Sequence, residues 1–274
     1  MREPSASCRR ETASAVPGKD LSDALGLRAR EHVAIVGGGG KTSLMLALAD
    51  ELTRRGCRVV ATTTTRVRHE EAGRFPAVMI SEAGTAWPWR VRELLGECGR
   101  VFLGERILPS GKVEGISPAT ADKLFMDGAA DHVIVEADGS AGRPVKAPAA
   151  HEPVVPESAT LVVAVMGLEA MGRRFNSETV FRPEEVQRIT RAVPGCVLTP
   201  EILSMLFQAP GGLFKGAPET AGRVAFLNKL DLIEDRSQAS ALVEMLAGRP
   251  GGSAHRVVAG SLILGDYPIV RINA

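Results

Sequence analysis

Four successive glycines stand directly before a lysine, a threonine and a serine: Gly37, Gly38, Gly39, Gly40, Lys41, Thr42 and Ser43. Glycine permits positive φ and close backbone approach, so several N–H groups can point into one concavity. Lys41 adds a full positive charge, and the hydroxyl of Thr42 suits Mg²⁺. This order of residue types predicts a cradle for the phosphates of a nucleotide, with Lys41 also acting on the reacting group.

The match to a Walker A phosphate loop is incomplete, because that pattern would need glycine at Ile35. Two other interpretations of the glycine run remain open. A dinucleotide-binding loop would need glycine in place of Thr42 and an acid at the end of the next strand, where 60–65 has none. An ordinary turn before a core helix explains the glycines but not the Lys-Thr pair. The phosphate loop is therefore favoured over both.

Two acids follow a second apolar run. Val133–Val135 leads into Glu136 and Asp138, and Gly139 comes next. An acid at a strand end can bind Mg²⁺ directly or through water, opposite Thr42. The alternative is a plain strand that ends in a polar turn. We predict a metal site made of Thr42, Glu136 and Asp138, with Asp138 slightly preferred because it adjoins the glycine, and we give Asp138 a catalytic role.

A short polar segment follows a later apolar run. Asn228, Lys229 and Asp231 stand in the sequence Asn-Lys-Leu-Asp after Val224–Leu227. An aspartate here can accept from both N1–H and the N2 amino group of guanine, while the lysine stem covers the base and the asparagine ties the segment to the phosphate loop. A pattern of only four residues arises easily by chance, so this interpretation depends mainly on the position of the segment after a predicted strand. The pattern favours GTP over ATP.

Further polar residues lie near the predicted strand ends. Threonines fill 62–65 and Arg66 follows, which is typical either of a β-rich strand end or of hydroxyls near a γ-phosphate with Arg66 as a charge stabiliser. Arg143, Lys146 and Lys215 lie in loops rich in glycine or proline. They could contact phosphate or an acidic substrate, although solvated side chains are the commoner explanation.

The elements around these residues alternate between strands and helices. After the apolar run 33–36, Leu44, Leu48 and Leu52 repeat at helical spacing. A further apolar run covers 160–165, Ser117 with Pro118 marks a helix start, and a helix is expected over 183–192. This alternation of strands and helices indicates a three-layer α/β fold with a mostly parallel sheet. We predict one nucleotide-binding domain over 19–274, with a possible small β-hairpin near 104–116, and a flexible segment over 1–18.

Composition excludes several other classes. The chain has 274 residues and a formal net charge of +1, so bulk charge favours neither nucleic acid nor an acidic membrane. No apolar run approaches the roughly 20 residues of a membrane helix. The four cysteines and five histidines are scattered, without the spacing of a zinc site. These features favour a cytoplasmic protein with reduced cysteines.

Several longer segments together resemble the YqeC family. They are Val-Gly-Gly-Gly-Gly-Lys-Thr-Ser, Ala-Thr-Thr-Thr-Thr-Arg, Gly-Ile-Ser-Pro near 115, the block 136–148, Leu-Thr-Pro-Glu at 198–201, Gly-Gly-Leu-Phe-Lys-Gly at 211–216 and Asn-Lys-Leu-Asp. That family is labelled as selenium-dependent hydroxylase accessory proteins. The resemblance covers about 20–272 and implies a P-loop NTPase-like fold and a partner that is a molybdenum hydroxylase or its cofactor.

We therefore expect an Mg²⁺-dependent NTPase that prefers GTP and serves as a maturation factor for such a hydroxylase. Two other functions stay open. One is a ligase or kinase that passes phosphate to a small acid or alcohol, and the other is a module that holds nucleotide without turnover.

Overall fold

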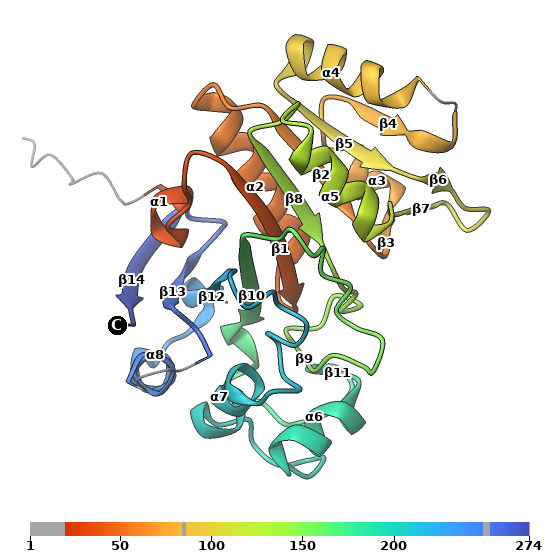
Figure 1. Ribbon diagram of the computed structural model, residues 1–274. Coiled ribbons are helices and arrows are strands. Elements are labelled where there is room, and N and C mark those ends of the chain that lie inside the picture. The colour runs from red at the N-terminus through yellow and green to blue at the C-terminus, as the bar shows by residue number, and fades with distance from the viewer. Residues whose placement is uncertain (1–19, 84–85, 249–252, 274) are drawn as a thin grey trace, which may run out of the picture.

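A nine-stranded sheet forms the centre of the computed structural model, which describes residues 20–83, 86–248 and 253–273 (Figure 1). The strand order is β14-β13-β12-β10-β1-β8-β2-β5-β4, and every neighbouring pair is parallel except β13 and β14. The strands are β1 (Glu31–Gly37), β2 (Val59–Thr63), β4 (Val78–Ile80), β5 (Arg100–Gly104), β8 (His132–Glu136), β10 (Leu161–Gly167), β12 (Gly222–Asn228), β13 (Arg256–Ser261) and β14 (Asp266–Ile272).

Two small sheets accompany the large one. A three-stranded antiparallel sheet has the order β3-β7-β6, and a two-stranded parallel sheet joins β11 and β9. Their bounds are β3 (Arg66–Arg68), β6 (Arg106–Ile107), β7 (Lys112–Glu114), β9 (Val145–Lys146) and β11 (Val180–Phe181). The hairpin of β6 and β7 lies within the expected excursion over 104–116, and β3 adds a strand to it that the sequence pattern does not reveal.

Helices cover both faces of the large sheet. The α-helices are α1 (Leu21–Leu25), α2 (Lys41–Arg54), α3 (His69–Ala72), α4 (Trp87–Cys98), α5 (Pro118–Met126), α6 (Pro183–Thr190), α7 (Pro200–Gln208) and α8 (Arg236–Ala247). Short 3-10 turns are η1 (Ser81–Ala83), η2 (Leu168–Ala170) and η3 (Leu230–Leu232). As expected for a helix start, Ser117 caps α5 by accepting from the N–H of Thr120.

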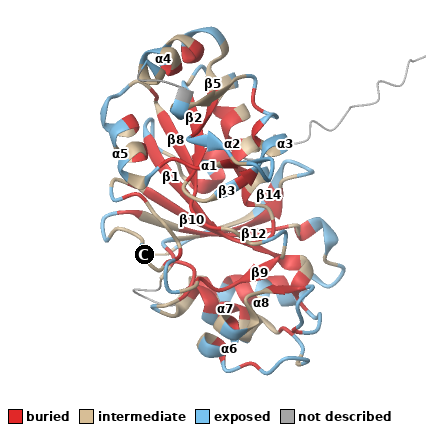
Figure 2. Ribbon diagram, turned by 90° about the vertical axis from the view of Figure 1, so that its right-hand side faces the viewer, coloured by how far each residue is buried: buried red, intermediate tan, exposed pale blue. Residues whose placement is uncertain are grey.

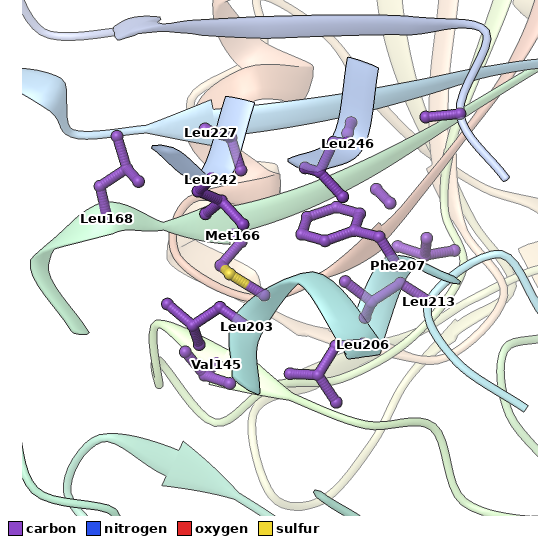
Figure 3. Close-up of a cluster of buried hydrophobic side chains, with 14 of the residues drawn as sticks. Val145, Met166, Leu168, Leu203, Leu206, Phe207, Leu213, Leu227, Leu242 and Leu246 are labelled. Atoms are coloured by element: carbon purple, nitrogen blue, oxygen red, sulfur yellow. The ribbon is translucent and has the colours of Figure 1, made fainter. Parts of the chain in front are cut away.

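Alternate residues of each central strand pack against opposite layers. On β1, Val33 and Ile35 join the cluster under α1 and α2, whereas Ala34 and Val36 join the cluster under α6, α7 and α8. The central strands β1, β8 and β10 are buried along their length (Figure 2). The second cluster is built around Met166, Leu203 and Phe207 (Figure 3). On the same side, α4 and α5 cover β2, β5 and β8. This burial on both faces confirms the three-layer, mostly parallel α/β fold.

The element boundaries differ from the expected ones by a few residues. The strand expected over 160–165 extends as β10 to Gly167, and the helix expected over 183–192 ends at Thr190 because Arg191 adopts φ 61°. The expected flexible segment over 1–18 lies outside the described residues. Within the described part of the chain, every helix is too short or too polar to cross a membrane.

Candidate functional site

The glycine run lies between β1 and α2, at the edge where the parallel strands end. Gly37, Gly39 and Gly40 have φ values of 98°, 77° and 130°. A Cβ on Gly37 would lie 2.2 Å from the carbonyl oxygen of Val165, and a Cβ on Gly39 would lie 2.2 Å from the nitrogen of Gly167. No side chain fits in either place. Glycine is needed here for both backbone conformation and close approach to β10.

Helix α2 begins directly after the glycine loop, and its first N–H groups have no acceptor in the part of the chain that the structure describes. Gly40 is the N-cap residue, so no side chain caps the helix. The first bond of the helix runs from Leu44 N–H to Gly40 O, and among described residues nothing accepts from the N–H groups of Lys41, Thr42 and Ser43. A 14-residue helix carries partial positive charge at this end. The start of α2 is therefore suited to bind an anion.

Lys41 is buried between two acids. Its Nζ donates to Gly37 O at 2.8 Å and to Ser140 Oγ at 3.2 Å, and it lies 3.4 Å from Asp138 Oδ1 and 3.6 Å from Glu136 Oε1. Burial alone would lower the pKa of this lysine, but Asp138 and then Glu136 raise it above its usual value. Lys41 is therefore a charged group held next to the glycine loop.

The two acids have different surroundings. Thr42 Oγ1 donates to Glu136 Oε2 at 2.9 Å, and burial raises the pKa of Glu136 even though Lys41 opposes the shift. Asp138 accepts from the N–H of Gly37 at 3.1 Å on both oxygens, and its Oδ2 lies 2.9 Å from Lys146 Nζ. The structure thus places Glu136 next to Thr42, whereas Asp138 is occupied by the loop backbone and two lysines.

A segment over 139–145, here called the strap, contacts the glycine loop. The N–H of Gly39 donates to Arg143 O at 3.0 Å, and the N–H of Gly167 donates to Pro144 O at 3.0 Å. A Cβ on Gly38 would lie 2.5 Å from Arg143 O. The strap therefore packs against the loop and uses one of its N–H groups.

Lys146 corrects an expectation. The sequence favoured a solvated lysine, but its side chain is fully buried and pairs with Asp138 and with Glu152 Oε2 at 2.7 Å. Arg182 pairs with the same glutamate, and its Nη2 donates to Glu152 Oε1 at 3.1 Å. Burial would raise the pKa of Glu152, but Lys146 and Arg182 hold it below its usual value.

Glu152 and Arg182 were not singled out from the sequence. Residues Lys146 and Phe181 pair in register in the small sheet of β9 and β11, which brings Arg182 beside Lys146. Strands of two residues leave no periodic pattern in a sequence. The only available signal was the specific 136–148 block, which marks the neighbourhood of Lys146.

The segment over 228–231, here called the base segment, lies only in part next to the glycine loop. Asn228 is buried, its Nδ2 donates to Gly39 O at 2.9 Å and its Oδ1 accepts from Leu262 N–H at 3.2 Å. Lys229 adopts φ 65° and pairs with Glu169. Asp231 is exposed on η3. The segment is thus tied to the phosphate loop through Asn228, and Lys229 with Glu169 lines a neighbouring cavity of about 550 Å³.

The hydroxyls of the threonine run over 62–65 mainly form hydrogen bonds with neighbouring backbone segments. The hydroxyls of Thr62, Thr63 and Thr64 donate to the carbonyl oxygens of Leu103, Glu136 and Val154. Arg66 is exposed and its ion pair within the described chain is with Glu114, at 3.5 Å. Lys215 is partly buried and donates to Ala149 O and Ala150 O, each at 2.8 Å. The structure therefore gives Lys215 a role in holding the 147–156 loop.

Comparison with solved structures finds proteins of low sequence identity. Signal recognition particle 54 kDa protein from Aeropyrum pernix K1, solved with GDP, is 18% identical with a TM-score of 0.38, and the match covers 88% of this chain and 43% of that one. FtsY from Mycoplasma mycoides is 11% identical with a TM-score of 0.40, covering 91% of this chain and 67% of that one. The chain thus spans less than half of the first of these proteins.

Comparison of sequences gives a closer relation. The family model described as YqeC protein matches residues 33–184, which include the glycine loop, both acids and Arg182. The protein named "Uncharacterized protein YqeC" from Escherichia coli (strain K12) is 34% identical over 214 residues, covering 78% of this chain and 82% of that protein. The chain therefore belongs to the YqeC family.

Proposed function

We propose that this protein is an Mg²⁺-dependent nucleoside triphosphatase that prefers GTP over ATP. The observation that carries the proposal is the arrangement at the start of α2. Three N–H groups that have no acceptor within the described residues, a buried charged lysine and a hydroxyl paired with a carboxylate surround one glycine loop. Such a set binds phosphate oxygens through the backbone and the lysine, and it offers oxygen ligands to a cation.

The oxygen donors fit Mg²⁺. Mg²⁺ usually takes one or two carboxylates or hydroxyls and completes its shell with water and phosphate oxygens. Thr42 Oγ1 and Glu136 Oε2 already lie 2.9 Å apart, so both would hold the ion, and Asp138 would orient a bound water. The ion supplies neutralisation of charge on the phosphates. This assignment reverses the preference for Asp138 that the sequence suggested, because Asp138 has three other partners.

The residues of the chain would act mainly by positioning and charge. Lys41 lies 3.4 Å and 3.6 Å from its two acids, longer than a tight charged hydrogen bond, so phosphate oxygens can compete for it. The N–H groups of Lys41, Thr42 and Ser43 would hold the phosphate oxygens in place during transfer. Arg66 remains a proposed charge stabiliser, which would have to leave Glu114 to act.

The base assignment rests on Asn228, Lys229 and Asp231. Asn228 connects this segment to Gly39, so the base and the phosphates would be bound by two loops in contact. The exposed carboxylate of Asp231 has no ion-pair partner among the described residues and is therefore able to accept from guanine. Lys229 would cover the base with its alkyl stem after leaving Glu169.

The biological role proposed is that of a maturation factor for a molybdenum-dependent, and in some cases selenium-dependent, hydroxylase. It is supported by the family's label rather than by a feature of the site. Nucleotide hydrolysis would then switch the hold on the hydroxylase or its cofactor. A second function, phosphate transfer to a bound acid or alcohol, is favoured by a cavity next to the strap that could hold such an acceptor.

A nucleotide-binding panel tests the proposal. GTP and ATP analogues are titrated with and without Mg²⁺, and phosphate release is then followed with GTP and ATP. We expect Mg²⁺-dependent binding and release that Lys41→Ala abolishes, while Lys112→Ala, at the exposed start of β7, serves as a matched control. Binding without any release over hours would leave a nucleotide-binding module. Absence of binding to either nucleotide by folded protein would disprove the proposal.

A further inference from the structure

We propose that a second cavity, beside the nucleotide site, binds a small organic anion and communicates with the phosphate loop through a chain of buried charges. The cavity measures about 590 Å³ and is here called the side cavity. Its lining includes Thr65, Arg66, Ser117, Gly139, His151 and Arg182. The proposal rests on the nucleotide function proposed above and adds the class of molecule on which hydrolysis would act.

The side cavity is lined by two arginines and three glutamates, and two of the glutamates are paired with the arginines. Arg182 and Glu152 form one ion pair at its wall, and the arginine side chain is 23% exposed against 7% for the glutamate. Arg66 and Glu114 form a second ion pair, in which 62% of the arginine side chain is exposed against 21% of the glutamate side chain. In both pairs the guanidinium is the accessible partner. Guanidinium groups bind carboxylate and phosphate through paired hydrogen bonds, so a ligand with such a group fits this wall.

The rest of the lining selects for a polar molecule. Ser117 contributes a hydroxyl, and the exposed Glu105 contributes a carboxylate that has no ion-pair partner in the described ranges. A carboxylate repels a second negative group but accepts from hydroxyl or amino donors. The ligand class is therefore a small organic anion that also carries hydroxyl or amino groups. An acceptor alcohol or acid for phosphate transfer belongs to this class.

A continuous chain of ion pairs joins the side cavity to the phosphate loop. It runs from Lys41 to Asp138 at 3.4 Å, from Asp138 to Lys146 at 2.9 Å, from Lys146 to Glu152 at 2.7 Å and from Glu152 to Arg182. The first four residues are buried. Removing one partner of a buried pair leaves the next charge uncompensated, so a change at one end alters the free energy at the other.

The backbone is strained near both ends of this series of ion pairs. Arg182 adopts φ 57° and Ala141, in the strap, adopts φ 48°, although neither is glycine. Such conformations persist only where their surroundings hold them, and they concentrate at binding sites. A ligand anion that takes Arg182 from Glu152 would strengthen the hold of Glu152 on Lys146 and loosen that of Lys146 on Asp138. Asp138 would then bind Lys41 more strongly, and nucleotide affinity would fall.

The experiment measures anion binding with the nucleotide site already filled. Parent protein saturated with Mg²⁺ and a non-hydrolysable GTP analogue is titrated by calorimetry with 3-phosphoglycerate, with glycerate and with glycerol. We expect both anions to bind and neutral glycerol not to bind. Arg182→Gln should weaken anion binding about tenfold or more, because it removes a charge-assisted pair. Arg188→Gln, on the exposed face of α6, should leave it unchanged.

The two anions distinguish the group that is recognised. Binding of glycerate as tightly as 3-phosphoglycerate assigns the carboxylate, whereas a preference for 3-phosphoglycerate assigns the phosphate. Equal anion binding by the parent and by folded Arg182→Gln would overturn the site, and so would glycerol binding as tightly as the anions. Folding of each variant is checked by its thermal unfolding curve. Arg182→Lys, which keeps the charge, should restore part of the affinity.

Communication is tested by the reciprocal measurement. Nucleotide affinity of the parent is determined with and without saturating 3-phosphoglycerate, and an anion-dependent loss of at least about threefold is expected, since linked sites change each other's affinity by the same factor. Arg182→Gln should abolish the change. An unchanged affinity would overturn the link. Anion binding by protein that binds no nucleotide would retain the site and reject the nucleotide function, so the two failures are distinguishable.

Discussion

The phosphate loop and the base segment differ in how firmly the fold holds them. At the phosphate loop, Lys41, Thr42 and Asp138 each have partners within the site, and glycine is required at close backbone contacts. At the base segment only Asn228 is buried and anchored, while Lys229 pairs with Glu169 and Asp231 is exposed. Under the proposed function, phosphate recognition is built into the sheet edge, whereas base recognition needs rearrangement on binding.

The largest expected effect concerns Lys41. Lys41→Ala should weaken nucleotide binding or turnover on the order of 100-fold or more, because it removes the charge nearest the loop. The measurement is nucleotide affinity and phosphate release beside Lys112→Ala. If folded Lys41→Ala keeps the parent's nucleotide affinity and phosphate-release rate, the glycine loop is not the phosphate site.

The two acids provide the next test. Glu136→Gln should raise the Mg²⁺ concentration needed for half-maximal nucleotide binding about 30-fold, in the range found when metal ligands or their close partners are changed. Asp138→Asn should have a smaller effect on Mg²⁺ and a larger one on thermal stability, since Lys41 and Lys146 would lose a buried partner. A larger effect of Asp138→Asn than of Glu136→Gln on the Mg²⁺ requirement would instead assign Asp138 as the metal ligand.

Nucleotide identity tests the base segment. A carboxylate at Asp231 would pair with guanine N1–H and N2 but would be repelled by the unprotonated N1 of adenine, so we expect GTP to bind at least about tenfold tighter than ATP. Asp231→Asn should shift preference toward xanthine nucleotides, measured by competition. Equal affinity of the parent for ATP and GTP would make this segment a plain turn.

The smallest effect is expected at Glu169. Glu169→Gln removes the partner that competes for Lys229, so nucleotide should bind about threefold tighter, in line with the modest strength of partly exposed ion pairs. Glu244→Gln, on an exposed helix face, is the matched control. Weaker binding in Glu169→Gln would show that the pair helps to form the base site.

The strands of the large sheet and most of the helices could be predicted from the sequence, because apolar runs and capping residues are local signals. Val33–Val36, Ser117 with Pro118 and the spacing of Leu44, Leu48 and Leu52 each act within one element. The partners of Lys146 could not be predicted, because Glu152 and Arg182 reach it through a strand pair of two residues and a proline-rich loop. Long-range ion pairs leave no periodicity. Their discovery needed the folded chain.

The contact between the strap and the glycine loop has a consequence for the rate of nucleotide entry. The N–H of Gly39 is bonded to Arg143 O, so a phosphate that needs this N–H must wait until the strap opens. Observed rates in stopped-flow traces should then level off at high nucleotide concentration, at the opening rate of the strap. A rate that keeps rising linearly with concentration would show that the strap does not limit entry.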